Sequence, residues 1–144
     1  MVEEVTAVAA VPRPDVDIAA DIDNLLTVYP PMVKDRDYVH YTVDEGVVTL
    51  AGHVRTGITR RYITETVRGL PGVKSLDDSQ LYDDGALRLE AGQVIPVGVM
   101  VSVEYGVVIL SGQLPTGANE RELVSRIEAL PGVRAVRTNF LKLR

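Results

Sequence analysis

The chain has no cysteine and no tryptophan, and only one phenylalanine and two histidines in 144 residues. Without cysteine there is neither a disulfide framework nor thiolate chemistry, so the composition leaves the compartment open. No hydrophobic run approaches the ~20 residues that a membrane-spanning helix needs. Because 46% of the residues are hydrophobic and 24% are charged, the composition predicts an ordinary soluble globular chain without a transmembrane segment.

An excess of basic charge is also missing, since 15 Lys and Arg stand against 20 Asp and Glu, for a net charge of -5. Nucleic-acid binding proteins normally carry a basic face. The one basic cluster is more typical of a solvated strand edge, and no nucleic-acid partner is predicted. Its members are Arg134, Arg137, Lys142 and Arg144.

The first residues, Met1-Val2-Glu3-Glu4, are acidic where a secretory signal carries positive charge. We therefore expect a cytoplasmic protein from the sequence as written. A native precursor that began with a signal peptide would instead place the protein in the periplasm or cell envelope.

What the chain does have is an internal repeat with an offset of 60 positions. Residues Gly46–Val73 align without a gap with Gly106–Val133, and 12 of the 28 positions are identical. The shared residues are glycines and aliphatic side chains, not reactive groups. A repeat of this kind predicts two structural units of roughly 60 residues that pack on each other, since units of this size are marginal alone.

Each copy contains a β-hairpin followed by a helix and a further strand. The alternation of aliphatic residues predicts a hairpin in which Val43 lies opposite Val48, with Glu45-Gly46 as a two-residue turn. The second copy predicts Val103 opposite Val108, with the turn at Tyr105-Gly106. Six glycines are expected to shape the bends of the two copies. They are Gly46, Gly52, Gly72, Gly106, Gly112 and Gly132.

Helical periodicity predicts a leading helix over 17–29, a helix over 60–69 that begins at the N-cap Thr59, and a helix over 120–130 that begins at Asn119. The segment 83–98 breaks the parallel between the copies, because four Gly and Pro residues leave no room for a three-turn helix. Asp84-Gly85 is instead typical of a hairpin turn, with Ala86–Leu89 as added strand.

The predicted organisation is a flexible lead-in (1–15), a first unit (16–82), a hairpin or linker (83–98) and a truncated second unit (99–144). The predicted fold is α+β, with a three-stranded mixed sheet in each unit and helices on one face. The second unit is expected to lack its leading helix.

The order of these elements resembles the BON domain, which occurs in two copies in bacterial osmotically induced periplasmic proteins. The residues that carry the resemblance are Gly46–Gly52 with Gly72-Val73, and Gly106–Gly112 with Gly132-Val133. The resemblance implies a non-enzymatic module of the cell envelope and the stress response that binds phospholipid membranes or protein partners. The leading helix of the second unit, which is associated with lipid contact in some members, is the part that this chain is predicted to lack.

The residues themselves predict no catalytic site, no metal and no cofactor. The only histidines, His40 and His53, are predicted on the outer sheet face at a diagonal offset, where a metal pair would need a third ligand that the sequence does not offer. Two unrelated exposed histidines are the favoured interpretation. Ser111 lies within a strand and not on a nucleophile elbow.

Two kinds of partner remain. The outer sheet face of the second unit carries Met100, Val107 and Ile109, and such exposed apolar area predicts a contact with another protein or with a second copy. A second such surface is the inner face that a missing leading helix would uncover, which carries Val101, Val103, Val108 and Leu110. The alternative is the surface of an anionic phospholipid membrane. Its headgroups would meet three arginines on the exposed side of the first unit's helix. These are Arg60, Arg61 and Arg68.

Overall fold

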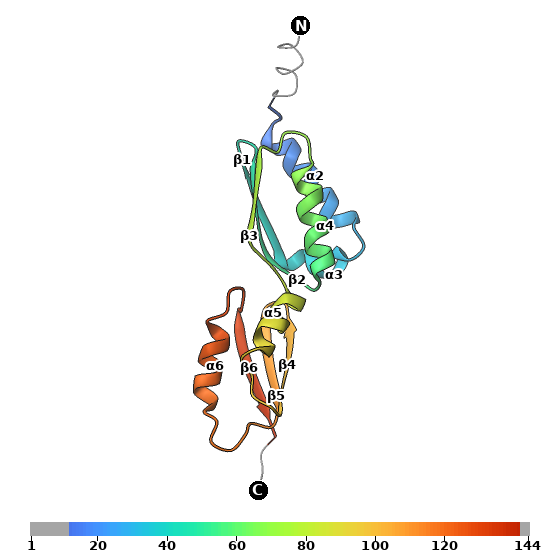
Figure 1. The fold of residues 1–144 in the computed structure, drawn as a ribbon. Helices are drawn as coiled ribbons and strands as arrows, with labels where there is room; N and C mark the ends of the chain where they lie inside the picture. Colours follow the sequence, from blue (N-terminus) through green and yellow to red (C-terminus); the bar gives the residue numbers. More distant parts are fainter. Residues whose placement is uncertain (1–11, 142–144) are drawn as a thin grey trace.

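The computed structural model describes residues 12–141, which form two α+β units in chain order (Figure 1). Each unit has a three-stranded mixed sheet, with strand orders β1-β2-β3 and β4-β5-β6. The predicted fold class is confirmed. The lead-in predicted over 1–15 lies mostly outside the described residues. In the part of the chain that is described, no helix combines the length and apolar character that crossing a bilayer requires.

The first unit runs from a long helix to a parallel third strand. Its elements are α2 (Asp15–Val28), α3 (Met32–Asp35), the 3-10 helix η1 (Arg36–Tyr38), β1 (Val39–Asp44), β2 (Val47–Val54), α4 (Gly57–Arg68) and β3 (Ser75–Asp83). The second unit repeats this order with a shorter start. Its elements are α5 (Asp84–Gly92), β4 (Val99–Glu104), β5 (Val107–Gly112), α6 (Glu120–Glu128) and β6 (Ala135–Phe140).

Both hairpins have the predicted register. Val43 pairs with Val48 in the first unit, and Val103 pairs with Val108 in the second. The first turn residues, Glu45 and Tyr105, have φ angles of 49° and 47°, so both hairpins use a turn with left-handed backbone at two successive positions. A left-handed tyrosine is uncommon, and Tyr105 proves to be important for the contact between the units.

One layer of helices covers one face of each sheet and encloses a separate core. In the first unit α2 and α4 bury Ile18, Ile22 and Ile63 against the sheet, together with Leu50. In the second unit Leu110 occupies the position of Leu50, and both leucines are fully buried. The two halves therefore have their equivalent leucines at matching depth, as the repeat predicts.

The helix starts were predicted with mixed success. Asn119 caps α6 as expected, because its side chain accepts a hydrogen bond from the Glu122 N–H. The N-cap of α4 is Thr56 and not Thr59, so that prediction was wrong. Thr59 lies inside the first turn and is buried, while its N–H donates to the Thr56 side chain. The helix begins earlier because Thr56 has the extended backbone of an N-cap residue and its hydroxyl accepts that hydrogen bond.

The hairpin predicted around Asp84-Gly85 was also wrong, because this segment forms the nine-residue helix α5. The Asp83 side chain caps the helix by accepting a hydrogen bond from the Ala86 N–H at 2.8 Å. The glycines that argued against a helix lie at its two ends, Gly85 in the first turn and Gly92 at the last position. Burial of Leu87 and Ala91 supplies the tertiary contacts that a short helix needs.

The second unit nevertheless has a much reduced leading segment. In the first unit α2 has 14 residues and is followed by α3, whereas α5 has 9 residues and leads through an irregular segment, 93–98, into β4. The helix is therefore shortened and not absent. The space that the end of α2 and α3 fill in the first unit is only partly filled in the second.

Candidate interaction site

The outer sheet face of the second unit carries the three residues that were predicted as an interface. Met100 is 65% exposed, and Val107 and Ile109 are half-buried on the neighbouring strand. In the register of the sheet, Ile109 pairs with Arg137 of β6, which brings a cation beside the apolar side chains. The equivalent positions of the first unit are His40, Val47 and Thr49, so the apolar character of the face belongs mainly to the second unit.

A hollow of about 250 Å³ lies beside this face, between it and the first unit. Its walls include Tyr38 and Tyr105, whose rings stack with centroids 3.8 Å apart and planes within 5° of parallel. The Arg134 guanidinium lies 5.9 Å from the centre of the Tyr38 ring and donates to the Tyr105 carbonyl oxygen at 3.0 Å. The hollow is thus formed by both units.

Tyr105 anchors the second unit to the first. Its hydroxyl donates to Asp35 Oδ1 at 2.7 Å, and the same oxygen accepts a hydrogen bond from Arg55 Nε at 2.6 Å. Asp35 is 1% exposed, so its carboxylate is buried together with the Tyr105 phenol, while the Arg55 side chain that pairs with it is 43% exposed. Burial raises the pKa of the Tyr105 hydroxyl, and the bond to Asp35 raises it further. Tyr105 therefore stays protonated and remains a donor at physiological pH.

Asp84 holds the hairpin turn that carries Tyr105. Its carboxylate accepts hydrogen bonds from the Tyr105 N–H at 2.7 Å and from the Gly106 N–H at 3.1 Å. In the first unit Asp15 binds the N–H groups of Glu45 and Gly46 in the same way. In each unit, the first residue of the leading helix thus binds the hairpin turn. Burial raises the pKa of Asp84, although these two hydrogen bonds act in the opposite direction.

The structure corrects the prediction for one histidine. His40 is exposed as expected, but His53 is 9% exposed and lies between the units. Its Nε2 donates to the Gly132 carbonyl oxygen of the second unit at 2.6 Å. Hence His53 is a contact residue of the junction. Among the described residues, no group of three or more acidic or histidine side chains is arranged to hold a metal.

The junction was not predicted from the sequence. Asp35 and Tyr38 had no motif around them, Asp84 was assigned to a hairpin turn, and Asp35 lies 70 positions from Tyr105. The one available signal was Tyr105 itself, an aromatic residue at a left-handed turn position where the first copy has Glu45.

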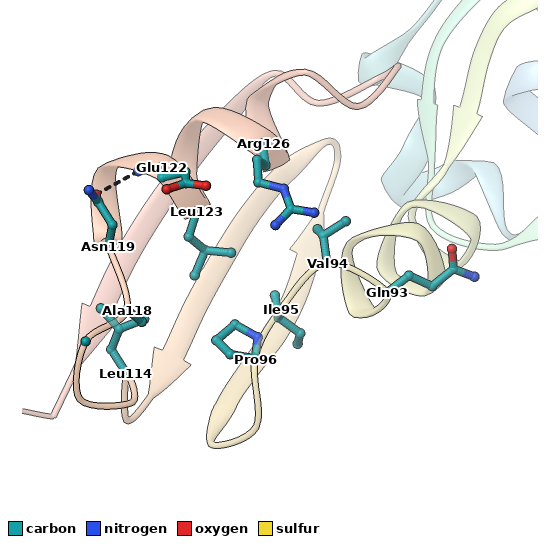
Figure 2. Close-up of a pocket in the computed structure, with 11 residues that line it drawn as sticks. Gln93, Val94, Ile95, Pro96, Leu114, Ala118, Asn119, Glu122, Leu123 and Arg126 are labelled. Carbon is teal, nitrogen blue, oxygen red and sulfur yellow. Dashed lines mark hydrogen bonds between the residues drawn. The ribbon is translucent and has the colours of Figure 1, made fainter.

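A groove of about 430 Å³ opens on the second unit beside α6 (Figure 2). It lies where α6 faces the segment between α5 and β4, and its apolar lining includes Ile95, Leu114 and Leu123. In the first unit, the positions equivalent to Leu114 and Leu123 are occupied by Val54 and Ile63. Both are fully buried in a cluster that also contains Leu26 and Met32 of the leading segment. The groove is therefore the space left open by the shortened leading helix.

The three arginines proposed as headgroup contacts are not equivalent. Arg60 donates to the carbonyl oxygens of Leu81 and Asp78 at 2.6 and 2.9 Å and thereby holds β3 near its bulge. Arg61 and Arg68 are exposed on α4. Near the start of that helix Ile58 is 80% exposed and Tyr62 is 43% exposed. Of the three arginines, Arg61 and Arg68 form no such bond with the described residues, whereas Arg60 does.

The chain matches one family model, and its fold is similar to those of several solved structures. The family model described as BON domain matches residues 14–81 and again residues 84–144. No curated protein matches the chain. The fold is similar to CdsD, a structural protein of the type III secretion system of Chlamydia trachomatis, with 18% identity, 88% of this chain and 92% of that chain covered, and a TM-score of 0.38.

A second similar fold is the periplasmic domain of PrgH, a type III secretion inner membrane protein from S. typhimurium. Here the identity is 16%, 90% of this chain and 78% of that chain are covered, and the TM-score is 0.33. These two likenesses are too weak to carry a partner or an activity over to this chain.

Proposed function

Because this chain belongs to the BON domain family, two copies of which make up nearly its whole length, we propose that it is a non-catalytic protein-interaction module. The second unit provides the contact surface, and the first partner that we propose is another copy of the chain. The observation that supports this is the outer face of β4 and β5, where Met100, Val107 and Ile109 expose apolar area next to Arg137. Interface centres are typically apolar with arginine enriched beside them.

Light scattering over a range of concentrations tests this proposal. The wild-type protein is expected to self-associate, and Met100→Glu is expected to weaken the association at least about tenfold, because it places a charge in an apolar contact. His40→Glu is the matched control, since His40 is exposed at the equivalent position of the first unit. A monomer at millimolar concentration, or equal effects of the two substitutions, contradicts self-association through this face.

The alternative is peripheral binding to anionic phospholipid membranes through α4. It is supported by the exposed Ile58 and Tyr62 beside Arg61, because an apolar side chain next to a cation suits the membrane interface. Each arginine near an anionic surface contributes roughly 1 kcal/mol. Sedimentation with anionic and with neutral liposomes tests this function. Binding to anionic liposomes alone, lost in the double variant Arg61→Glu/Arg68→Glu, supports it, and equal sedimentation with both liposomes contradicts it.

A further inference from the structure

The third strands of the two units, β3 and β6, lie at the edges of their sheets, and the edge of β3 is protected by side chains of its own unit. Arg60 donates to the carbonyl oxygens of Leu81 and Asp78 at 2.6 and 2.9 Å. The Asp77 carboxylate accepts a hydrogen bond from the Ser79 N–H at 3.0 Å. The register of β3 on β2 also shifts within the strand, and such bulges keep an edge strand from pairing with another chain.

The edge of β6 lacks this protection. Its residues, Ala135–Phe140, pair with β5 in a register without a shift. Glu120 occupies the position of Arg60, and Arg137 occupies the position of Asp77. The guanidinium and the carboxylate that bind the backbone of β3 therefore have no counterpart at the equivalent positions of the second unit. Because an edge strand presents a row of unpaired N–H and C=O groups, β6 offers a regular backbone edge to which a further strand can bind.

The charge of this segment indicates which strand can bind. Residues 133–144 contain four basic side chains and no acidic one. Arg134 and Arg137 are exposed, and neither forms an ion pair with a described carboxylate. Like charges on adjacent strands are destabilising, so the β6 strand of a second copy is a poor partner. The β3 strand of a second copy is acidic, but Arg60 occupies its edge. The complementary occupant is an acidic strand from a different protein.

We propose that β6 binds an extended acidic segment of a partner protein, which adds a fourth strand to the sheet of the second unit. In this mode of recognition backbone hydrogen bonds supply the affinity, and flanking side chains supply the specificity. Arg137 pairs with an acidic residue of the added strand. Leu141, which follows β6 and is 70% exposed, favours a segment that also contains aliphatic residues. This surface is distinct from the outer sheet face proposed for self-association, although Arg137 borders both, and its partner is not a second copy.

The first test compares three synthetic peptides of about ten residues, a length that spans a typical strand. In the first peptide, glutamate and valine alternate. The second replaces valine with proline, which keeps the charge but removes the N–H donor of every other residue. The third replaces glutamate with lysine. In fluorescence anisotropy at low ionic strength, the glutamate–valine peptide is expected to bind at least about tenfold more tightly than either control. Equal binding of the glutamate–proline peptide would show attraction by charge alone and would overturn the inference.

The second test reverses the charge at the edge. Arg137→Glu is expected to weaken binding of the glutamate–valine peptide about tenfold, because like charges then lie on adjacent strands, and to strengthen binding of the lysine–valine peptide. Arg68→Glu is the matched control, since it makes the same change of net charge at an exposed position of the first unit. Equal effects of the two substitutions would contradict recognition at β6. Circular dichroism establishes that both variants are folded.

Amide hydrogen exchange shows where the peptide lies. Successive N–H groups of a strand point alternately to its two sides, and those of β6 that point to β5 are already hydrogen-bonded. Binding of the glutamate–valine peptide is therefore expected to slow exchange at alternate residues of Ala135–Phe140. Binding without this alternating protection, or no binding at low ionic strength, overturns the inference.

Met100→Glu separates the two surfaces of the second unit. The substitution is expected to weaken self-association through the outer sheet face and to leave binding of the glutamate–valine peptide unchanged. Peptide binding by a chain that does not self-associate would remove the proposed self-association and support the edge of β6 on its own. Loss of peptide binding in Met100→Glu would place the peptide on the outer face and contradict the edge contact.

Discussion

At the scale of single residues, the chain concentrates its buried polar chemistry at the contact between the units. Asp35, Asp84 and Tyr105 are each buried, and each has named hydrogen-bond partners. A buried carboxylate is costly unless it is paired or hydrogen-bonded. These groups therefore fix the geometry of the junction more than they add to its strength.

The raised pKa of Asp84 predicts that the stability of the chain depends on pH. An unfolded aspartate has a pKa of about 3.9, so the folded chain takes up the proton of Asp84 at a higher pH than the unfolded chain does. The contribution of this group to the free energy of unfolding is fully present below about pH 3.9 and is lost as the pH rises through the raised pKa.

Urea unfolding of the wild type and of Asp84→Asn at several pH values measures this contribution. The stability of the wild type relative to Asp84→Asn is expected to be greater near pH 4 than at neutral pH, because the amide cannot titrate. A difference that is independent of pH, or that favours the wild type more at neutral pH, would contradict the assignment.

At the scale of elements, the two hairpin turns are alike in backbone but not in surroundings. Gly46 and Gly106 have φ angles of 82° and 80°, and a Cβ at either would approach the carbonyl oxygen of Gly72 or Gly132 at 2.8 or 2.9 Å. The surroundings differ because a Cβ on Gly106 would also collide with the His53 ring of the other unit.

We therefore expect Gly106→Ala to destabilise the chain more than Gly46→Ala. Each substitution costs roughly 1–2 kcal/mol of stability, because left-handed backbone is unfavourable for a residue with a Cβ. Only Gly106→Ala must also displace the His53 ring. Chemical denaturation of both variants measures the difference. The double variant Gly106→Ala/His53→Ala is expected to show a smaller loss than the sum of its two single variants, since the collision is gone. Additive losses would contradict this account.

At the scale of the whole molecule, the two units form an end-to-end arrangement with the described ends of the chain far apart (Figure 1). The hairpin of the second unit meets the end of the first through the Tyr38–Tyr105 stack, the Asp35 bond and the His53 bond. This contact is not repeated at the free ends. Glu45 occupies the position of Tyr105, and Gly98 and Gln113 occupy those of Tyr38 and His53, so copies of the chain cannot stack further through the same contacts.

The prediction at this scale is that the units tumble together. Nitrogen-15 relaxation is expected to give one rotational diffusion tensor for the wild type. Two different correlation times are expected for Tyr105→Ala, which removes the stack and the bond to Asp35 together. Tyr62→Ala is the control, because Tyr62 stacks on Tyr29 within the first unit. Independent tumbling of the wild-type units would show that the junction does not hold them.

Much of each unit could be predicted from the sequence because its determinants are local or periodic. The alternation of aliphatic residues and the two-residue turns fix the register that pairs Val43 with Val48 and Val103 with Val108. The 60-residue repeat then extends the same fold to the second half. These features depend on neighbours along the chain, and such neighbours are visible in a sequence.

Only the tertiary structure decided what lies between and around the units. Helix α5 forms because Leu87 and Ala91 are buried against the rest of the fold. The free energy of this burial outweighs the weak helix propensity of its two glycines. His53 is buried because Gly132, 79 positions away, brings a carbonyl oxygen to its ring. The groove is open because α5 is shorter than the segment that closes the first unit. Each of these outcomes depends on contacts between residues distant in sequence, and no local pattern encodes them.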